Sequence, residues 1–322
     1  MKNKTIIIGL TVSLLLSTTT GRAAYTPTLE DDSIYEITNV SSAEEADFSL
    51  VEIDENGQAA VTYYKYNIKE GAVSHEPLDE DMKGQDITGN FFGQTGGNGA
   101  AITNRTDTVF NSWDIGNITG DFIGNYTLGS YSVQGGAIYN SGTIGDITGD
   151  FIGNYDTSRG SAYGGAIYNE NATIGDIIGD FIGNYASSSN YSDYVYGGAI
   201  YNAGNIGSVS GDLIANHTSA SDLLALGGAV YTSSDMTFSA GGKVRTISGN
   251  YTEDTKRGKN YNGLFVYKLS SSLPTITFDT AGGGAWVIND NIEGGTDNLF
   301  SVGYKTQYNL SFTGDGVLNE DG

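Results

Sequence analysis

The chain has no cysteine, only 3 prolines in 322 residues, and 15 lysines and arginines against 38 acidic residues. Without cysteine, a disulfide scaffold and a cysteine-based zinc or iron–sulfur site are excluded. A net charge of −23 repels phosphate backbones, which excludes nucleic-acid binding. The chain is instead rich in glycine, with 47 residues, and in tyrosine, with 22, and its 38% hydrophobic content is enough to form a core. Abundant glycine without a three-residue repeat excludes collagen and indicates an extended β architecture.

Residues 1–23 are predicted to be a secretory signal peptide. Lys2 and Lys4 make a basic start, residues 5–16 form an apolar run of 12 residues, and Gly21–Ala23 places small residues at the cleavage position. The apolar run is too short to cross a bilayer as a helix, which takes about 20 residues. We therefore expect an exported protein.

The middle of the chain repeats with a period of about 30 residues. A first block, Gly-Asp-Phe-Ile-Gly-Asn-Tyr and its degenerate copy, begins at Gly120, Gly149, Gly179 and Gly211. A second block, Gly-Gly-Ala-Ile-Tyr-Asn and its degenerate copy, begins at Gly135, Gly164, Gly197 and Gly227. Weaker copies lie upstream and downstream. Two blocks that stay in step in this way indicate a solenoid of stacked supersecondary units.

The repeat unit is predicted to consist of strands. Ile144, Ile147 and Phe151 have a spacing that also suits a helix, but the glycines inside that window cost a helix about 1 kcal/mol each relative to alanine. Three short strands separated by glycine corners fit a coil of this length. We therefore predict an all-β fold, a right-handed parallel β-helix with an N-terminal cap, in which each coil rises by about 4.8 Å.

Equivalent residues of successive coils are expected to stack into ladders. Two apolar columns would line the core: Ile138, Ile167, Ile200 and Val230, and Phe122, Phe151, Phe181 and Leu213. Two amide ladders would form from Asn140, Asn169 and Asn202, and from Asn125, Asn154, Asn184 and Asn216. In each ladder the side chains would hydrogen-bond to their neighbours above and below.

Aspartates also recur, at 146 and 176 and at 121, 150, 180 and 212. Stacked carboxylates repel each other, so these columns are expected to face water at the turns or to hold a cation. Calcium is the candidate cation because its ligands are oxygens, but the calcium-binding nonapeptide repeat is absent. We therefore predict no cofactor and no metal ligand, with calcium at the aspartate columns as the alternative.

Four segments between the two blocks differ from coil to coil in length and sequence: 127–134, 156–163, 186–196 and 218–226. They are predicted to be loops at one edge of the solenoid, where binding residues usually lie. Tyr191, Tyr194 and Tyr196 in the longest loop are the candidate partner-binding residues, because tyrosine joins an apolar ring to a polar tip. A loop packed against itself is the alternative.

The domain organisation follows from these patterns. After the signal peptide, residues 24–85 are acidic and are predicted to be a cap of a few strands over the open end of the solenoid. Residues 86–270 form the repeat β-helix, and residues 271–322 form further coils that are expected to continue beyond the chain end.

The repeats resemble those of polymorphic outer-membrane proteins and related autotransporter passengers. The resemblance rests on Phe-x-x-Asn, as in Phe122 with Asn125, followed by Gly-Gly-Ala-Ile, and on the stretches 276–290 and 308–316, and it covers residues 86–322. It implies a bacterial surface β-helix, at the Gram-negative outer membrane or released, which acts in adhesion or host contact as a virulence factor. Its partners would be a host or neighbouring-cell protein or glycan, and the outer membrane through a C-terminal barrel. The chain stops at Gly322 without such a barrel, so we expect a fragment.

A secreted β-helix polysaccharide lyase or glycoside hydrolase is the alternative function. Such enzymes need a carboxylate pair, and the aspartates could supply one, but their repetition along the coils indicates a structural role. Arg105 and Arg159 are the only bases from 86 to 242, which disfavours an anionic polysaccharide, and neither His75 nor His217 suggests a Ser-His-Asp site. We therefore predict no catalytic residues. A purely structural spacer is also compatible with the sequence.

Overall fold

A computed structural model describes most of the repeat region and parts of both ends of the chain. The described residues are 6–9, 34–53, 59–77, 84–104, 114–189, 194–221, 225–254, 258–260, 264–266, 274–288, 300–301, 309–313 and 318–319. They form strands and turns but no helix, so no membrane-spanning helix is found among them.

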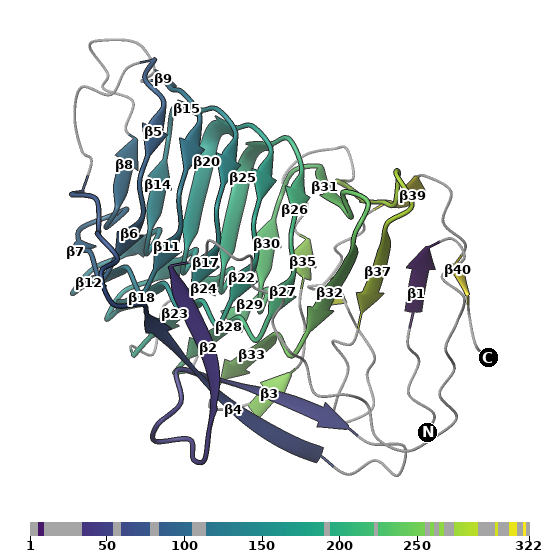
Figure 1. The fold of residues 1–322 in the computed structure, drawn as a ribbon, viewed down its shortest axis with the longest axis horizontal. Helices are drawn as coiled ribbons and strands as arrows, with labels where there is room; N and C mark the ends of the chain where they lie inside the picture. The colour runs from purple at the N-terminus through teal and green to yellow at the C-terminus, as the bar shows by residue number, and fades with distance from the viewer. Residues whose placement is uncertain are drawn as a thin grey trace.

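The solenoid is a parallel β-helix of five sheets, numbered here I to V in the order in which the chain visits them (Figure 1). Sheet I contains β5 (Ile87–Thr88), β10 (Ile118–Thr119), β16 (Ile147–Thr148), β21 (Ile177–Ile178), β26 (Val209–Ser210), β31 (Met236–Ser239), β36 (Thr275–Asp279) and β39 (Asn309–Thr313). Sheet II contains β6 (Phe91–Phe92), β11 (Phe122–Ile123), β17 (Phe151–Ile152), β22 (Phe181–Ile182), β27 (Leu213–Ile214), β32 (Val244–Ser248), β37 (Ala285–Ile288), β1 (Ile6–Gly9) and β40 (Leu318–Asn319).

The remaining sheets complete each coil. Sheet III contains β7 (Thr95–Gly96), β12 (Tyr126–Gly129), β18 (Tyr155–Ser158), β23 (Tyr185–Ser188), β28 (His217–Ala220), β33 (Tyr251–Asp254) and β34 (Gly258–Asn260). Sheet IV contains β13 (Val133–Gln134), β19 (Ala162–Tyr163), β24 (Val195–Tyr196) and β29 (Ala225–Leu226). Sheet V contains β8 (Ile102–Asn104), β14 (Ile138–Asn140), β20 (Ile167–Ile174), β25 (Ile200–Ile206), β30 (Val230–Thr232), β35 (Leu264–Val266) and β38 (Phe300–Ser301), with β9 (Asp114–Ile115) and β15 (Thr143–Ile144) alongside.

The predicted parallel β-helix is therefore confirmed, but a full coil has five strand positions rather than three. The coil from β16 to β20 runs through all five sheets in 28 residues, from Ile147 to Ile174. Its first two strands are only two residues long, because Gly149 and Gly153 follow them directly, and the third, β18, has four residues. Glycine corners at this density divide the coil into more and shorter segments than the repeat length alone suggests.

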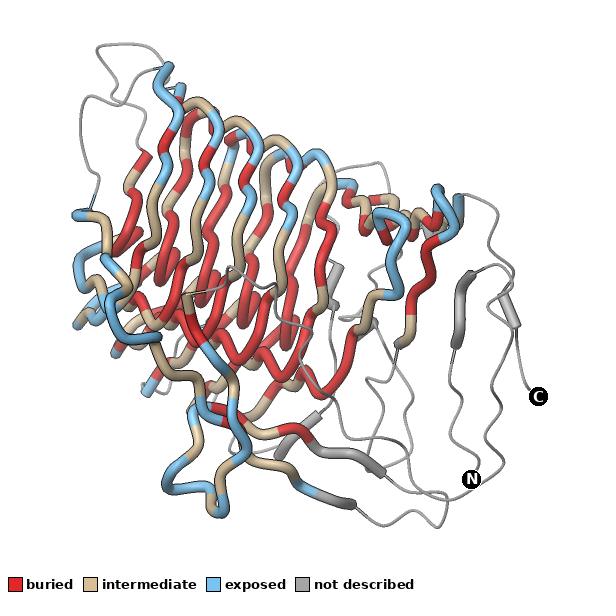
Figure 2. Tube along the Cα trace, viewed as in Figure 1, coloured by how far each residue is buried: buried red, intermediate tan, exposed pale blue. Residues whose placement is uncertain are grey.

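The two predicted apolar columns form the core. Ile138, Ile167 and Ile200 pair in register in sheet V and are fully buried. In sheet II the rings of Phe122, Phe151 and Phe181 are stacked in parallel at 4.8 and 4.7 Å. Figure 2 shows the buried residues as continuous red bands along the coils, because each buried position repeats at the same height in the next coil.

Both asparagine ladders are confirmed, and each is one coil longer than predicted. In the first, Asn104 donates to Asn140, Asn140 to Asn169, and Asn169 to Asn202. In the second, donation runs through Asn125, Asn154, Asn184, Asn216 and Asn250, at 2.9 to 3.0 Å. All these side chains are fully buried, and they provide hydrogen bonds where the chain turns inside the core.

A separate antiparallel sheet lies along the outside of sheet II. This flank sheet consists of β2 (Tyr35–Val40), β4 (Ala59–Ile68) and β3 (Phe48–Ile53), in that order. Its Tyr35, Phe48, Leu50 and Tyr64 pack on the outward isoleucines of sheet II, which are Ile123, Ile152, Ile182 and Ile214. The Tyr35 hydroxyl also donates to Asp150 at 2.5 Å.

The strands of the acidic segment 24–85 thus lie on the flank, whereas we expected them over the open end of the solenoid. Ser74 and His75 contact the first coil: the Ser74 hydroxyl accepts from the Phe92 amide at 3.1 Å, the His75 amide donates to the Asn90 carbonyl at 2.6 Å, and the His75 ring lies 5.0 Å from Phe91. The physical reason is the apolar stripe of outward isoleucines, on which the flank sheet buries its own apolar side chains.

The described part of the predicted signal peptide is β1. This strand runs antiparallel to β37, with Ile6 opposite Ile288 and Gly9 opposite Ala285, and it also pairs with β40. Cleavage after residue 23 remains a prediction.

Asp156 is a fully buried carboxyl at a position that other coils fill with uncharged residues. It stands in register with Thr127 below and Ala186 above, and Thr218 and Thr252 follow. The Thr127 hydroxyl donates to one of its oxygens, while the other has no hydrogen-bond partner. Burial raises the pKa of Asp156 well above its usual value of 3.8.

We expect the Asp156→Thr variant to become more stable than the native chain as the pH rises. The native carboxyl keeps its proton while the unfolded one ionises, so the native chain loses stability from the unfolded pKa upward. The stability difference between the two chains should grow by about 1.4 kcal/mol per pH unit from the unfolded pKa upward, until the native carboxyl itself ionises. Urea unfolding across this range measures it, and parallel pH profiles for the two chains would contradict it.

Candidate functional site

Two of the three predicted partner-binding tyrosines can be placed. Tyr191 lies outside the described residues. Tyr194 directly precedes β24, its backbone amide donates to Ser161 at 3.1 Å, and its side chain is 44% exposed. Tyr196 ends β24 and is half-buried, with its ring 5.7 Å from that of Tyr194.

Tyr196 is part of a larger aromatic surface that the sequence analysis did not identify. The rings of Tyr139, Tyr168, Tyr201 and Tyr231 stack along the outside of sheet V at 5.3, 4.9 and 5.2 Å. Tyr196 stacks on Tyr231 at 4.5 Å, and Tyr163 lies against Tyr196 and Tyr201. We call these six residues with Tyr194 the tyrosine surface, in which Tyr168 and Tyr231 are buried, Tyr194 is exposed and the other four are half-buried. A signal was present, because the second repeat block carries a tyrosine in every copy.

The hydroxyls of Tyr201 and Tyr168 stay protonated at physiological pH. Burial raises the pKa of Tyr201 to about 12, with Glu170 and Tyr163 adding to the shift. Burial also raises the pKa of Tyr168, whose hydroxyl donates to Glu170. The surface therefore combines stacked apolar rings with hydrogen-bonding tips, which suits contact with a sugar or a protein.

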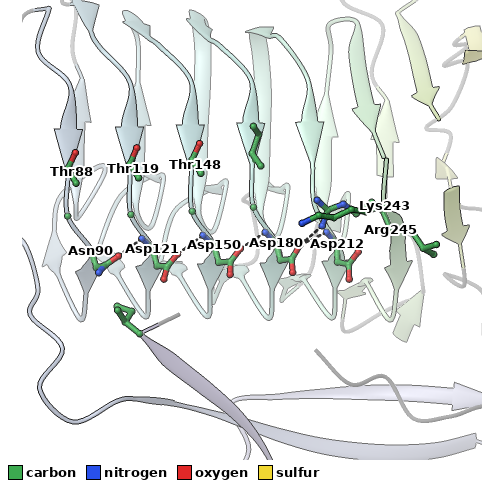
Figure 3. A pocket seen from close by; sticks show the side chains of 17 residues that line it. Thr88, Asn90, Thr119, Asp121, Thr148, Asp150, Asp180, Asp212, Lys243 and Arg245 are labelled. Carbon is green, nitrogen blue, oxygen red and sulfur yellow. Dashed lines mark hydrogen bonds and ion pairs between the residues drawn. The ribbon is translucent and has the colours of Figure 1, made fainter. Parts of the chain in front are cut away.

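A second candidate site is a groove of about 680 Å³ at the corner between sheets I and II. Figure 3 shows two rows of side chains along it, one coil apart at each step. One row is Thr88, Thr119, Thr148 and Ile178, and the other is Asn90, Asp121, Asp150, Asp180 and Asp212. Ile34 also lines the groove, and Lys243, Val244 and Arg245 close one end.

The aspartate row is a hydrogen-bond ladder, which corrects the expectation that these residues simply face water at the turns. Asp121 accepts from the backbone amide of Asp150, Asp150 from that of Asp180, and Asp180 from that of Asp212, at 2.7 to 2.9 Å. All four are half-buried. Their repetition therefore has a structural cause, since each carboxylate satisfies a main-chain donor of the next coil.

The second aspartate column makes the same kind of hydrogen bond between coils but is exposed to solvent. Asp146 is exposed and accepts from the amide of Asp176, which is exposed as well. Within the described ranges, no three acidic or histidine side chains converge in a way that could hold a metal ion.

Asp180 is the titratable group of the groove. Burial and the charges of Asp150 and Asp212 raise the pKa of Asp180 to about 7, although the Arg245 guanidinium at 3.4 Å opposes this shift. Near neutral pH the row therefore contains one carboxyl that exchanges its proton readily, between two neighbours one coil away.

Both histidines pack against aromatic rings. The ring of His217 is stacked between those of Tyr185 and Tyr251, at 5.0 and 4.7 Å, in a column that also contains Tyr126 and Tyr155. This confirms that His217 takes the place of the repeat's tyrosine.

No protein-family model, curated protein or solved structure matches the chain.

Proposed function

We propose that the chain is an exported, non-enzymatic β-helix of the autotransporter-passenger type that acts in adhesion at the cell surface. The observation that carries this proposal is the contrast between constant and variable parts of the coil. The core columns, asparagine ladders and aspartate ladder repeat from coil to coil. The four variable segments, predicted to be loops, instead form most of the strands of sheets III and IV, and their sequences differ in each coil. A scaffold that keeps its interior and varies one edge is typical of a binding protein.

The tyrosine surface is the contact face in this proposal. It lies beside the variable edge, and Tyr194, the most exposed described member, comes from the longest variable segment. Rings that are already stacked lose little conformational entropy when a partner packs on them. The partner is a protein or glycan of a host or neighbouring cell. Signal-peptide export and outer-membrane attachment through a C-terminal barrel belong to the same proposal.

Adhesion of beads coated with the full chain to cultured host cells tests this function. The double variant Tyr194→Ala, Tyr196→Ala is expected to bind at least tenfold more weakly, because tyrosines at the centre of an interface contribute about 1 to 2 kcal/mol each or more. Tyr63→Ala is the matched control, since Tyr63 is half-buried like Tyr196 but lies in the flank sheet, away from the variable edge. Equal adhesion by all three proteins, or no adhesion at all, would contradict the proposal and favour a spacer.

A glycan-degrading enzyme is the second candidate, and the groove is the observation that favours it. Neighbouring aspartates are one coil apart, about 4.8 Å, close to the roughly 5 to 5.5 Å between the two carboxyls of retaining glycosidases. Asp180, with its pKa near 7, would be the proton donor and Asp150 the nucleophile. New reducing ends from oligosaccharides, lost in Asp180→Asn, would establish this activity. Their absence at high protein concentration would exclude it.

A further inference from the structure

We infer that the groove between sheets I and II binds a linear, uncharged glycan that lies along the solenoid axis. This site is separate from the tyrosine surface, and the inference depends neither on adhesion nor on catalysis. It rests on the shape of the groove, the spacing and kinds of its side chains, and its charge.

The first argument is periodicity. The groove crosses the coils, so a ligand lying in it meets the same pair of groups, a threonine hydroxyl and a carboxyl or amide, once per coil. Thr88, Thr119 and Thr148 are exposed and occur at steps of about 4.8 Å. A repeated surface of this kind suits a polymer with a short repeat, because each unit can make the same contacts as the one before it.

The second argument is the floor of the groove, which is bare backbone. A β-carbon placed on Gly149 would lie 2.1 Å from the Gly120 carbonyl oxygen, and one on Gly120 would lie 2.0 Å from that of Gly89. Only glycine therefore fits between the two rows. A ligand can approach the main chain closely there and reach the hydroxyl row and the carboxyl row at once.

The third argument selects the chemistry of the ligand. Four aspartates face two bases in the groove, so a polymer of uronic acids or phosphates would be repelled. Threonine hydroxyls and carboxylates together can donate to and accept from the hydroxyls of a sugar. Ile178 and Val244, which are 48% and 57% exposed, offer apolar contact to the carbon–hydrogen faces of the rings.

A polyamine fits less well than a sugar. It would bind only the carboxylates. One oxygen of Asp121, of Asp150 and of Asp180 already accepts a main-chain hydrogen bond, and Asp180 also forms an ion pair with Arg245. The exposed hydroxyls and the apolar side chains would then contribute nothing. A polyamine is therefore an outcome that the experiment must distinguish from a glycan.

Calorimetric titration of the full chain tests the inference. The probes are the hexamers of β-1,4-linked glucose and of N-acetylglucosamine, with galacturonic acid hexamer as the anionic probe and spermine as the cationic one. We expect at least one neutral hexamer to bind, its monomer to bind much more weakly, and the anionic hexamer not to bind.

Three variants locate the site. Thr119→Val removes one hydroxyl without changing the size of the side chain, and it should weaken binding about fivefold. Asp121→Asn should weaken it by a similar factor while keeping the acceptor for the Asp150 amide, as Asn90 already does for Asp121. Ile178→Ala removes apolar contact with the sugar rings and should weaken binding about threefold.

The matched control is Asp146→Asn. Asp146 makes the same hydrogen bond to the next coil in the exposed column outside the groove, where Asn117 already takes this role. It should leave binding unchanged. Tyr196→Ala, in the tyrosine surface, should also leave it unchanged.

Three results would overturn the inference: no binding of either neutral hexamer, binding that none of the three groove variants alters, or binding of spermine alone. The inference and the adhesion proposal fail separately, because the groove variants leave the tyrosine surface intact. Cleavage of a bound hexamer would support both the inference and the enzymatic candidate.

Discussion

The Asn184→Leu variant is expected to lose about 4 kcal/mol of folding free energy. The Asn184 amide donates to the Phe151 carbonyl at 2.7 Å and to Asn216 at 2.9 Å, and its oxygen accepts from the Asn154 backbone amide and side chain. Leucine has a similar volume but no polar atoms, so it would leave the Asn154 backbone amide buried without a partner and would remove one hydrogen bond each from the Asn154 side chain, the Phe151 carbonyl and Asn216. An orphaned buried donor costs about 1 to 3 kcal/mol, and each lost hydrogen bond costs about 1 kcal/mol.

The control for this variant is Asn104→Leu at the end of the other ladder. Asn104 is also fully buried, but its oxygen has no partner already, and it donates only to Asn140 and to the Thr143 carbonyl. Its replacement should cost clearly less. Urea unfolding measures the loss of folding free energy in both variants. An equal loss would mean that an asparagine inside a ladder contributes no more to stability than one at its end.

The Gly153→Ala variant is expected to lose about 3 kcal/mol and to detach the flank sheet. Gly153 has φ of +58°, and a β-carbon there would lie 2.4 Å from Cε1 of the Tyr66 ring. Alanine in this conformation costs about 1 kcal/mol, and the overlap with Tyr66 adds about 1 to 3 kcal/mol. Limited trypsin digestion at Lys65 and Lys69 in and beside β4 reports the detachment, and thermal unfolding reports the stability.

Gly93→Ala separates the two causes. Gly93 occupies the same place two coils earlier, with φ of +64°, but nothing lies within 4 Å of its added β-carbon. It should lose only about 1 kcal/mol, with normal resistance to trypsin. Ala215, with φ of 53° in the same column, shows that the solenoid accepts alanine in this conformation. Equal cleavage of both variants would mean that Tyr66 does not hold the flank sheet in place.

The interior of the solenoid could be predicted from the sequence because it repeats. Phe151 and Asn154 stand at the same offset in each coil, so recognising the period was sufficient to predict both columns. The flank sheet could not be placed in this way. Residues 34–68 do not repeat, and the surface on which they dock, such as Ile152, becomes visible only when the inward and outward residues of each two-residue strand are known.

The candidate sites show the same limit. Tyr194 and Tyr196 could be selected from their loop, but their neighbours Tyr163 and Tyr231 come from other coils. The aspartates were recognised as a column. The groove beside them depends on the corner between sheets I and II, and Arg245 at its end belongs to no repeat block.

The in-register stacking of the coils also makes the protein a molecular ruler. An in-frame duplication or loss of one repeat would join strands that already match, so both asparagine ladders would close again without a new interface. The groove and the tyrosine surface would lengthen or shorten together by one step of about 4.8 Å. Natural length variants of this chain would then differ in how long a polymer they can hold, while each coil kept the same chemistry.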